Sequence, residues 1–185
     1  MSRMRYRIAR QSHVPAMARL RAANLPSEEA WKLRIASYLA KEHHPRQALR
    51  PRICYVALTG DKLAGYIAGH LTRRYHCDGE LQWINVIPNQ RGTGVAAELL
   101  QRLAKWFVKQ KARRICVDVD PANAPARRFY KKHGAQTLNA HWLVWPDIKI
   151  ALTKPAAPLD AAFIRKGAKL LLGKSRLLSR PRFSQ

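Results

Sequence analysis

Two short segments, each placed where an apolar run gives way to a helical pattern, restrict the possible folds of this chain most strongly. Residues 91–96 (Arg-Gly-Thr-Gly-Val-Ala) follow the apolar run 81–87 and Pro88, and they open a helix. Residues 123–130 (Asn-Ala-Pro-Ala-Arg-Arg-Phe-Tyr) follow a second apolar run, 115–119, and begin another helix. Either segment alone is weak evidence, because glycine turns before helices are common. Together they indicate two consecutive strand–turn–helix units.

The glycine turn has the chemistry of an anion site. A strand that enters such a turn and then a helix leaves unpaired backbone N–H groups at the helix N-terminus. Those donors suit a phosphate group, because the helix dipole also favours negative charge there. Gly92 and Gly94 have no Cβ, so the backbone can turn sharply and approach a ligand closely. Taken alone, the turn is equally compatible with an ordinary strand–helix connection.

In this order, each behind a strand, the two segments resemble the cofactor-binding half of the GNAT superfamily of N-acetyltransferases. The family patterns are Arg/Gln-x-x-Gly-x-Gly/Ala and Asn-x-x-Ala-x-x-Phe/Leu-Tyr-x-x-x-Gly-Phe. Here the second ends in residues 131–135 (Lys-Lys-His-Gly-Ala), so only the last aromatic is absent. The resemblance is specific from Glu80 to Ala135. It implies an α/β fold with a mixed, mostly antiparallel twisted sheet of six to seven strands and about four helices.

The resemblance also implies transfer of an acetyl group from acetyl-coenzyme A to an amine. The residues expected to contact the cofactor are Ile84, Asn85, Val86, Arg91, Gly92, Thr93, Gly94, Val95, Ala96, Ala97, Asn123 and Tyr130. The strand segment 84–86 would lie along the pantetheine arm, and Val86 or its neighbour would donate a hydrogen bond to the oxyanion. Asn123 would in addition cap its helix.

Tyr130 is the candidate acid for the departing thiolate. A phenol titrates near pH ~10 and a thiol near ~8.5, so complete proton transfer is uphill by roughly 2 kcal/mol. A strong hydrogen bond, with proton transfer late in the step, is therefore the prediction. The alternative is a tyrosine packed at the helix edge with its hydroxyl in water.

Two carboxylates are candidates for the base that deprotonates the amine. Glu80 begins the strand that leads to the glycine turn, where several family members carry a catalytic glutamate. Asp118 lies just before Asn123, where other members carry a glutamate; strand alternation places it on the face opposite Val117 and Val119. Asp118 is one methylene shorter than glutamate and would need a bridging water. We favour Glu80; for each, the alternative is a solvated carboxylate at a strand end.

Length and composition predict one catalytic domain, residues 1–153, followed by a basic amphipathic extension, residues 154–185. The chain has 185 residues, 47% of them hydrophobic, and no segment approaches the ~20 apolar residues that span a bilayer. Three scattered cysteines (Cys54, Cys77 and Cys116) and the lack of a signal-peptide pattern predict reduced thiols in the cytoplasm. No metal is expected, because the histidines lack ligand spacing.

The charge is the feature that the family resemblance does not explain. The formal net charge is +24, from 35 basic and 11 acidic residues. Such a surface attracts polyanions (RNA, the ribosome or an anionic membrane) and argues against polyamine or aminoglycoside acceptors. The alternative is a merely solvated basic surface. The extension would dock on the domain or on a second subunit in a homodimer, lie on a membrane, or bind nucleic acid.

The acceptor amine cannot be derived from these residues, so rival functions stay open. The same fold can hold acyl-coenzyme A as a sensor without turnover, or serve as a basic RNA-associated protein.

The expected elements outside the motifs are a strand at 6–9, a helix capped by Ser12, a helix opened by Ser27, a basic loop at 46–52, a hairpin of strands 53–58 and 63–71, and closing strands at 136–140 and 147–152 around a loop containing Trp142 and Trp145.

Overall fold

The computed structural model describes residues 3–22, 27–42 and 47–153, and the expected extension 154–185 lies outside the described residues. The strands are β1 (Met4–Ile8), β2 (Ala48–Thr59), β3 (Lys62–Thr72), β4 (Gly79–Val86), β5 (Ile115–Asp118), β6 (Gln136–Thr137) and β7 (Trp142–Trp145). The α-helices are α1 (Val14–Ala22), α2 (Glu28–Leu39), α3 (Val95–Lys109) and α4 (Ala124–Lys132). Short 3₁₀ turns are η1 (Gln11–His13), η2 (Arg74–His76), η3 (Pro88–Gln90) and η4 (Ile148–Leu152).

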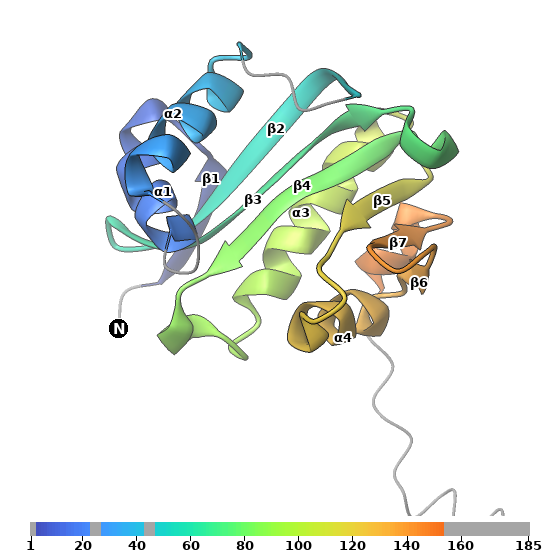
Figure 1. The fold of residues 1–185 in the computed structure, drawn as a ribbon. Coiled ribbons are helices and arrows are strands. Elements are labelled where there is room, and N and C mark those ends of the chain that lie inside the picture. The colour runs from blue at the N-terminus through green and yellow to red at the C-terminus, as the bar shows by residue number, and fades with distance from the viewer. Residues whose placement is uncertain (1–2, 23–26, 43–46, 154–185) are drawn as a thin grey trace, which may run out of the picture. The chain divides into compact units, whose positions relative to one another are not determined.

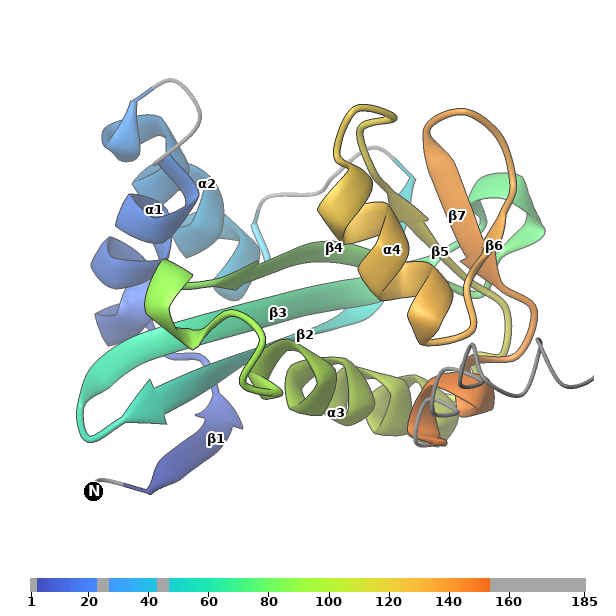
Figure 2. The same ribbon diagram turned by 90° about the horizontal axis from the view of Figure 1, so that it is seen from below.

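The strands form one seven-stranded sheet in the order β1-β2-β3-β4-β5-β7-β6. Only β4 and β5 run parallel, and every other neighbouring pair is antiparallel. Helices α1 and α2 cover one face of the sheet and α3 covers the other (Figures 1 and 2). The predicted mixed sheet with four α-helices is therefore confirmed. None of the helices in the described ranges has the length and apolar character needed to cross a membrane.

The sheet is forked between β4 and β5. These two strands pair at three positions only, from Gly79 opposite Ile115 to Leu81 opposite Val117. Beyond this point β4 continues to Val86 paired with β3 alone, and the register against β3 shifts by one residue at Gln82. Such a bulge bends the strand locally. From here on we call the gap between the separated parts of β4 and β5 the fork.

Local capping signals in the sequence are confirmed at two helices. The Ser27 side chain accepts a hydrogen bond from the Ala30 N–H at 3.1 Å and caps α2. The Asn123 Oδ1 accepts one from the Ala126 N–H at 3.1 Å and caps α4. Both side chains satisfy a donor that a helix N-terminus leaves unpaired.

The expected cap of α1 is wrong. Ser12 lies inside η1, and no side-chain cap by Ser12 is present. The Arg10 N–H instead donates to the His13 Nδ1 at 2.8 Å, one turn ahead of α1. The His13 ring thus bonds to the backbone ahead of α1 and does not accept from a first-turn N–H of that helix, as a cap would.

The basic loop expected at 46–52 is wrong from residue 48 onward, because β2 begins at Ala48 and pairs with the end of β3. Pro51 cannot donate to a ladder, and the register shift between Leu49 and Arg52 accommodates it.

The closing strands at 136–140 and 147–152 are also corrected. The first is reduced to the two residues of β6. In place of the second, residues 148–152 form η4. The Asp147 side chain caps η4 by accepting a hydrogen bond from the Lys149 N–H at 2.9 Å. The Trp142–Trp145 segment, expected in a loop, is β7; all four residues are buried and pair with β5.

A pair of glycine substitutions tests the packing at the end of α4. Gly134 has φ +89°, and a Cβ there would collide with the Ile150 side chain, whereas Gly92 has φ +78° and open space around it. Each change to alanine should cost about 1–2 kcal/mol for the left-handed backbone. Gly134→Ala should lose a further ~1–3 kcal/mol by overpacking. Urea unfolding measures both, and equal losses in the two variants would contradict this packing.

Candidate active site

At the fork, β4 presents backbone groups that no strand of the described residues pairs with. The Ile87 N–H donates to the Ala64 C=O of β3 at 2.9 Å. Because bonding alternates along an antiparallel ladder, Ile84 and Val86 direct their N–H and C=O groups away from β3. β5 pairs only as far as Leu81, so these groups face the fork, where the Val86 C=O accepts the Arg91 Nε at 3.3 Å. An extended ligand with amide groups could continue the ladder there.

The N-terminus of α3 follows β4 after η3 and the glycine turn, and it has no side-chain cap. Its first intrahelical bond runs from the Glu98 N–H to the Gly94 C=O at 3.0 Å, so the N–H groups of residues 95–97 have no helical partner. The Thr93 hydroxyl donates to the Gln90 C=O at 2.8 Å and therefore does not fill the role of a cap. A Cβ at Gly94 would meet no atom within 4 Å. The turn thus fits an anion such as a pyrophosphate.

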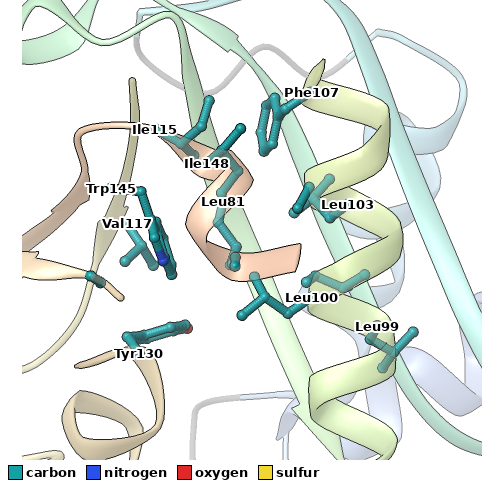
Figure 3. Close-up of a cluster of buried hydrophobic side chains, with 14 of the residues drawn as sticks. Leu81, Leu99, Leu100, Leu103, Phe107, Ile115, Val117, Tyr130, Trp145 and Ile148 are labelled. Atoms are coloured by element: carbon teal, nitrogen blue, oxygen red, sulfur yellow. The ribbon is translucent and has the colours of Figure 1, made fainter. Parts of the chain in front are cut away.

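Tyr130 lies on the α3 side of the fork, at the edge of the apolar core (Figure 3). Its ring packs edge-to-face against Trp145, with centroids 5.7 Å apart, and only 4% of the residue is exposed. Burial raises the pKa of the Tyr130 phenol, and the positive charge of Arg21 offsets part of that rise. The phenol is therefore a neutral hydrogen-bond donor at physiological pH.

Arg21 links α1 to the fork. Its Nη1 donates to the Asn85 Oδ1 at 3.1 Å, and its guanidinium lies 4.9 Å above the Trp31 ring. Nothing in the sequence patterns singled out Arg21, because an arginine on a helix is ordinarily solvated. Its place beside Asn85 depends on how α1 packs across the sheet.

Glu80 lies on the opposite face, in a buried polar cluster. Its Oε2 accepts the Arg74 Nε at 3.1 Å and lies 3.8 Å from the His70 Nε2. The Arg74 guanidinium in turn stacks over Trp142 at 4.8 Å. Glu80 is only 5% exposed. The sequence points to Glu80 but not to its partners, because they come from β3, η2 and β7 and meet only through strand register.

Asp118 shares the face of Glu80 but lies at the surface. Glu80 pairs with Cys116 in the β4–β5 ladder, so Asp118, two residues further on, points to the same side. Partial burial raises the pKa of Asp118; the Glu80 and Asp120 charges raise it too, while His141 and Arg74 lower it. No ion pair reaches Asp118 from the described ranges of the chain. The expected acid and the expected bases therefore occupy opposite faces of one fork.

Comparison with known proteins identifies the family of this chain. Residues 17–135 match the acetyltransferase (GNAT) family. The chain is 30% identical over 120 residues to uncharacterized N-acetyltransferases of Mycobacterium tuberculosis and Mycobacterium bovis, an alignment that covers 65% of this chain and 70% of each relative. The chain belongs to the GNAT family. It is accordingly an acetyltransferase, and members of this family use acetyl-coenzyme A.

Solved structures of other acetyltransferases share the fold. A GNAT-family protein from Desulfovibrio desulfuricans matches with a TM-score of 0.63 and 16% identity, over 79% of this chain and 99% of that one. The PaiA N-acetyltransferase of Thermoplasma acidophilum, solved in complex with coenzyme A, matches with a TM-score of 0.61 and 16% identity, over 77% and 97%. At these identities the likeness establishes the fold alone.

The raised pKa of Asp118 predicts a carboxylate that destabilises the acetyltransferase at neutral pH. A folded-state pKa above the unfolded value adds stability at low pH, and that contribution is lost as the pH rises through the folded-state pKa. Asp118→Asn should therefore unfold at a higher urea midpoint than the parent at pH 7. The difference should shrink as the pH falls toward ~4.

Asp61→Asn is the control for this measurement, because Asp61 is 97% exposed and pairs with Arg5 at 3.1 Å. That variant should show at most a small change in stability. A lower midpoint for Asp118→Asn at pH 7 would contradict the electrostatic account of this position.

Proposed function

We propose that this acetyltransferase uses acetyl-coenzyme A to acetylate an amine, with the cofactor held by residues 84–86, residues 91–97, Asn123 and Tyr130. One observation carries the proposal: the unpaired backbone of β4 leads, through η3 and the glycine turn, into the uncapped N-terminus of α3. The first suits the amide groups of a pantetheine arm, and the second suits a pyrophosphate. The open space around Gly92 and Gly94 is what a bulky anion there requires.

When bound, acetyl-coenzyme A supplies an acyl group activated as a thioester. The chain contributes a backbone N–H at Val86, which donates to the carbonyl oxygen as negative charge develops on it. The Tyr130 hydroxyl donates a hydrogen bond, and finally a proton, to the leaving sulfur. Glu80, directly or through a water, accepts the proton that the amine loses; Asp118 at the surface is the alternative acceptor.

The first test is Tyr130→Phe, which removes the proton donor and keeps the ring. The rate constant kcat should fall roughly 100-fold, while the Kd for acetyl-coenzyme A should stay nearly unchanged. Free-thiol release against a panel of amines measures turnover, and thermal unfolding with cofactor measures binding. Acetyl-coenzyme A at ~100 times its Kd should add about 2.7 kcal/mol of stability.

Tyr55→Phe, a half-buried tyrosine of β2 outside the fork, is the matched control and should keep full turnover. An unaltered chain whose melting temperature does not move at millimolar acetyl-coenzyme A would overturn the cofactor assignment. Equal rates for Tyr130→Phe and its parent would remove Tyr130 from the mechanism.

We further propose that the acceptor is presented on, or beside, a nucleic acid. The supporting observation is a hollow of about 400 Å³ at the C-terminal end of α3, lined by Val108, Lys111, Ala112, Arg113, Asp147 and Lys149. Its single acid, Asp147, is engaged by the Arg113 Nε at 3.1 Å, and the exposed Lys105 and Lys109 extend the basic rim along α3. A cationic rim of this kind attracts the phosphates of a nucleic acid.

The test substitutes glutamine for Lys109, Lys111 and Lys149 together and follows the binding of a fluorescent oligouridine as salt is varied. The slope of log affinity against log salt should decrease by about 2, because three phosphate contacts are lost. The matched control changes three exposed cations elsewhere, Arg3, Lys41 and Lys62, and should leave most of the slope. If the two triple variants decrease the slope equally, the hollow is not a specific binding site, and the nucleic acid binds to the basic surface as a whole.

A further inference from the structure

His70 is a buried imidazole beside the base, and the fold alone does not account for it. It lies in β3 directly opposite Glu80 in the antiparallel ladder and is 0% exposed. Opposed residues of a ladder point to the same face, so the ring and the carboxylate are held side by side by the backbone. An aliphatic residue would fill this position at lower cost, because a buried polar ring needs partners.

The hydrogen bonds around Tyr38 determine which ring nitrogen carries the proton. The Tyr38 hydroxyl donates to the Gly69 C=O at 2.9 Å. Only lone pairs of the Tyr38 oxygen then remain for the His70 Nδ1, which lies 3.3 Å away. Nδ1 must therefore be the N–H of the ring, and Nε2 carries the lone pair in the neutral imidazole.

That lone pair faces a carboxylate. Nε2 has no hydrogen-bond partner among the described residues and lies 3.8 Å from the Glu80 Oε2. A water that bridges two atoms with near-tetrahedral hydrogen bonds of ~2.7–3.0 Å needs a wider separation than this. Two acceptors therefore lie near each other in a buried place, and a proton on one of them forms a hydrogen bond once small side-chain movements bring the two atoms to ~2.8 Å.

We propose that Glu80 and His70 act as one proton-accepting pair, with His70 as the residue that positions and completes the base. The proton leaves the ammonium of the acceptor, reaches Glu80, and is shared with the His70 Nε2, while Nδ1–H stays bonded to Tyr38. The amine is thereby freed for attack, and no other bond changes at the pair. The inference rests on the function proposed above and specifies its base.

The charged and titratable groups around the pair come from five elements. They are Tyr38 of α2, Arg52 of β2 (4.9 Å above the Tyr38 ring), Arg74 of η2, and Cys116 and Asp118 of β5, together with Glu80 of β4 itself. The Arg74 Nε already donates to the Glu80 Oε2 at 3.1 Å, so one oxygen of the carboxylate has a cationic partner. A second acceptor for the proton is what allows a carboxylate paired with arginine to act as a base.

The test is His70→Asn, which keeps an amide N–H near the position of Nδ1 and lacks Nε2. We expect kcat to fall roughly 100-fold, with little change in KM for acetyl-coenzyme A. The acid limb of the rate profile should change its midpoint, because Glu80 alone must then hold the proton. The assay measures thiol release with the most active amine of the panel.

His133→Asn is the matched control: His133 is also buried, and its Nδ1 lies 2.8 Å from the Phe129 carbonyl oxygen. This variant should lose stability and keep the acid limb of the parent. A His70→Asn variant that keeps both the parent's rate and its pH profile would overturn the pairing.

Nitrogen-15 NMR of the unaltered chain gives a readout that does not depend on the variant folding or on turnover. His70 Nδ1 should be protonated throughout, and Nε2 should gain a proton as the pH falls, at a pH that Glu80→Gln changes. An unprotonated Nδ1, or an Nε2 titration indifferent to Glu80→Gln, would contradict the inference. A chain that binds no acetyl-coenzyme A would instead refute the proposed function and leave this NMR result standing.

Discussion

The early separation of β4 from β5 is the constraint on which the site depends. The fork stays open because side chains from α3, α4 and β7 occupy the space on one side of it, with Leu100, Tyr130 and Trp145 packed around Leu81 and Val117 (Figure 3). On its outer edge β5 is engaged by β7 from Ile115 to Asp118. Closing the fork would require β5 to leave β7 and the core to be repacked. The unpaired backbone of β4 is thus a consequence of packing.

Strand alternation then divides the chemistry between the two faces of the fork. Leu81 and Val117 point toward α3, where the surroundings are apolar and Tyr130 is held neutral by burial. Glu80 and Asp118 point to the other face, where charged partners are available. A proton donor and a proton acceptor with opposite requirements can work within one site only if their surroundings differ, and the sheet itself separates them.

The parts of this arrangement that the sequence predicted are those specified by neighbours along the chain. The glycines with positive φ, the Asn123 cap and the period of α3 are local signals, and they identified both motif units. The errors at β7 and at residues 48–52 have another cause. Trp142–Trp145 is a strand because β5 lies beside it, and Pro51 is tolerated because the register against β3 shifts there. Pairings between distant segments decide both.

The same distinction explains why the sequence pointed to Glu80 and missed the cluster around it. The contact between Glu80 and His70 depends on the register of β3 against β4, and that register includes a bulge at Gln82. A register one residue different would point either side chain to the opposite face of the sheet. The spacing of the histidines along the sequence contains no information about this pairing.

The buried polar cluster is poorly explained by stability. An ion pair such as Arg74–Glu80, with Glu80 only 5% exposed, must overcome the desolvation of both charges, and well-packed apolar residues of similar volume are often at least as stable. Here the cost is increased by the His70 Nε2, which lies without a hydrogen-bond partner among the described residues. Arg74, Glu80 and His70 thus contribute little to the stability of the fold, yet they lie together at the closed end of the fork, beside the proposed cofactor site. Proton transfer explains this cluster better than a structural role does.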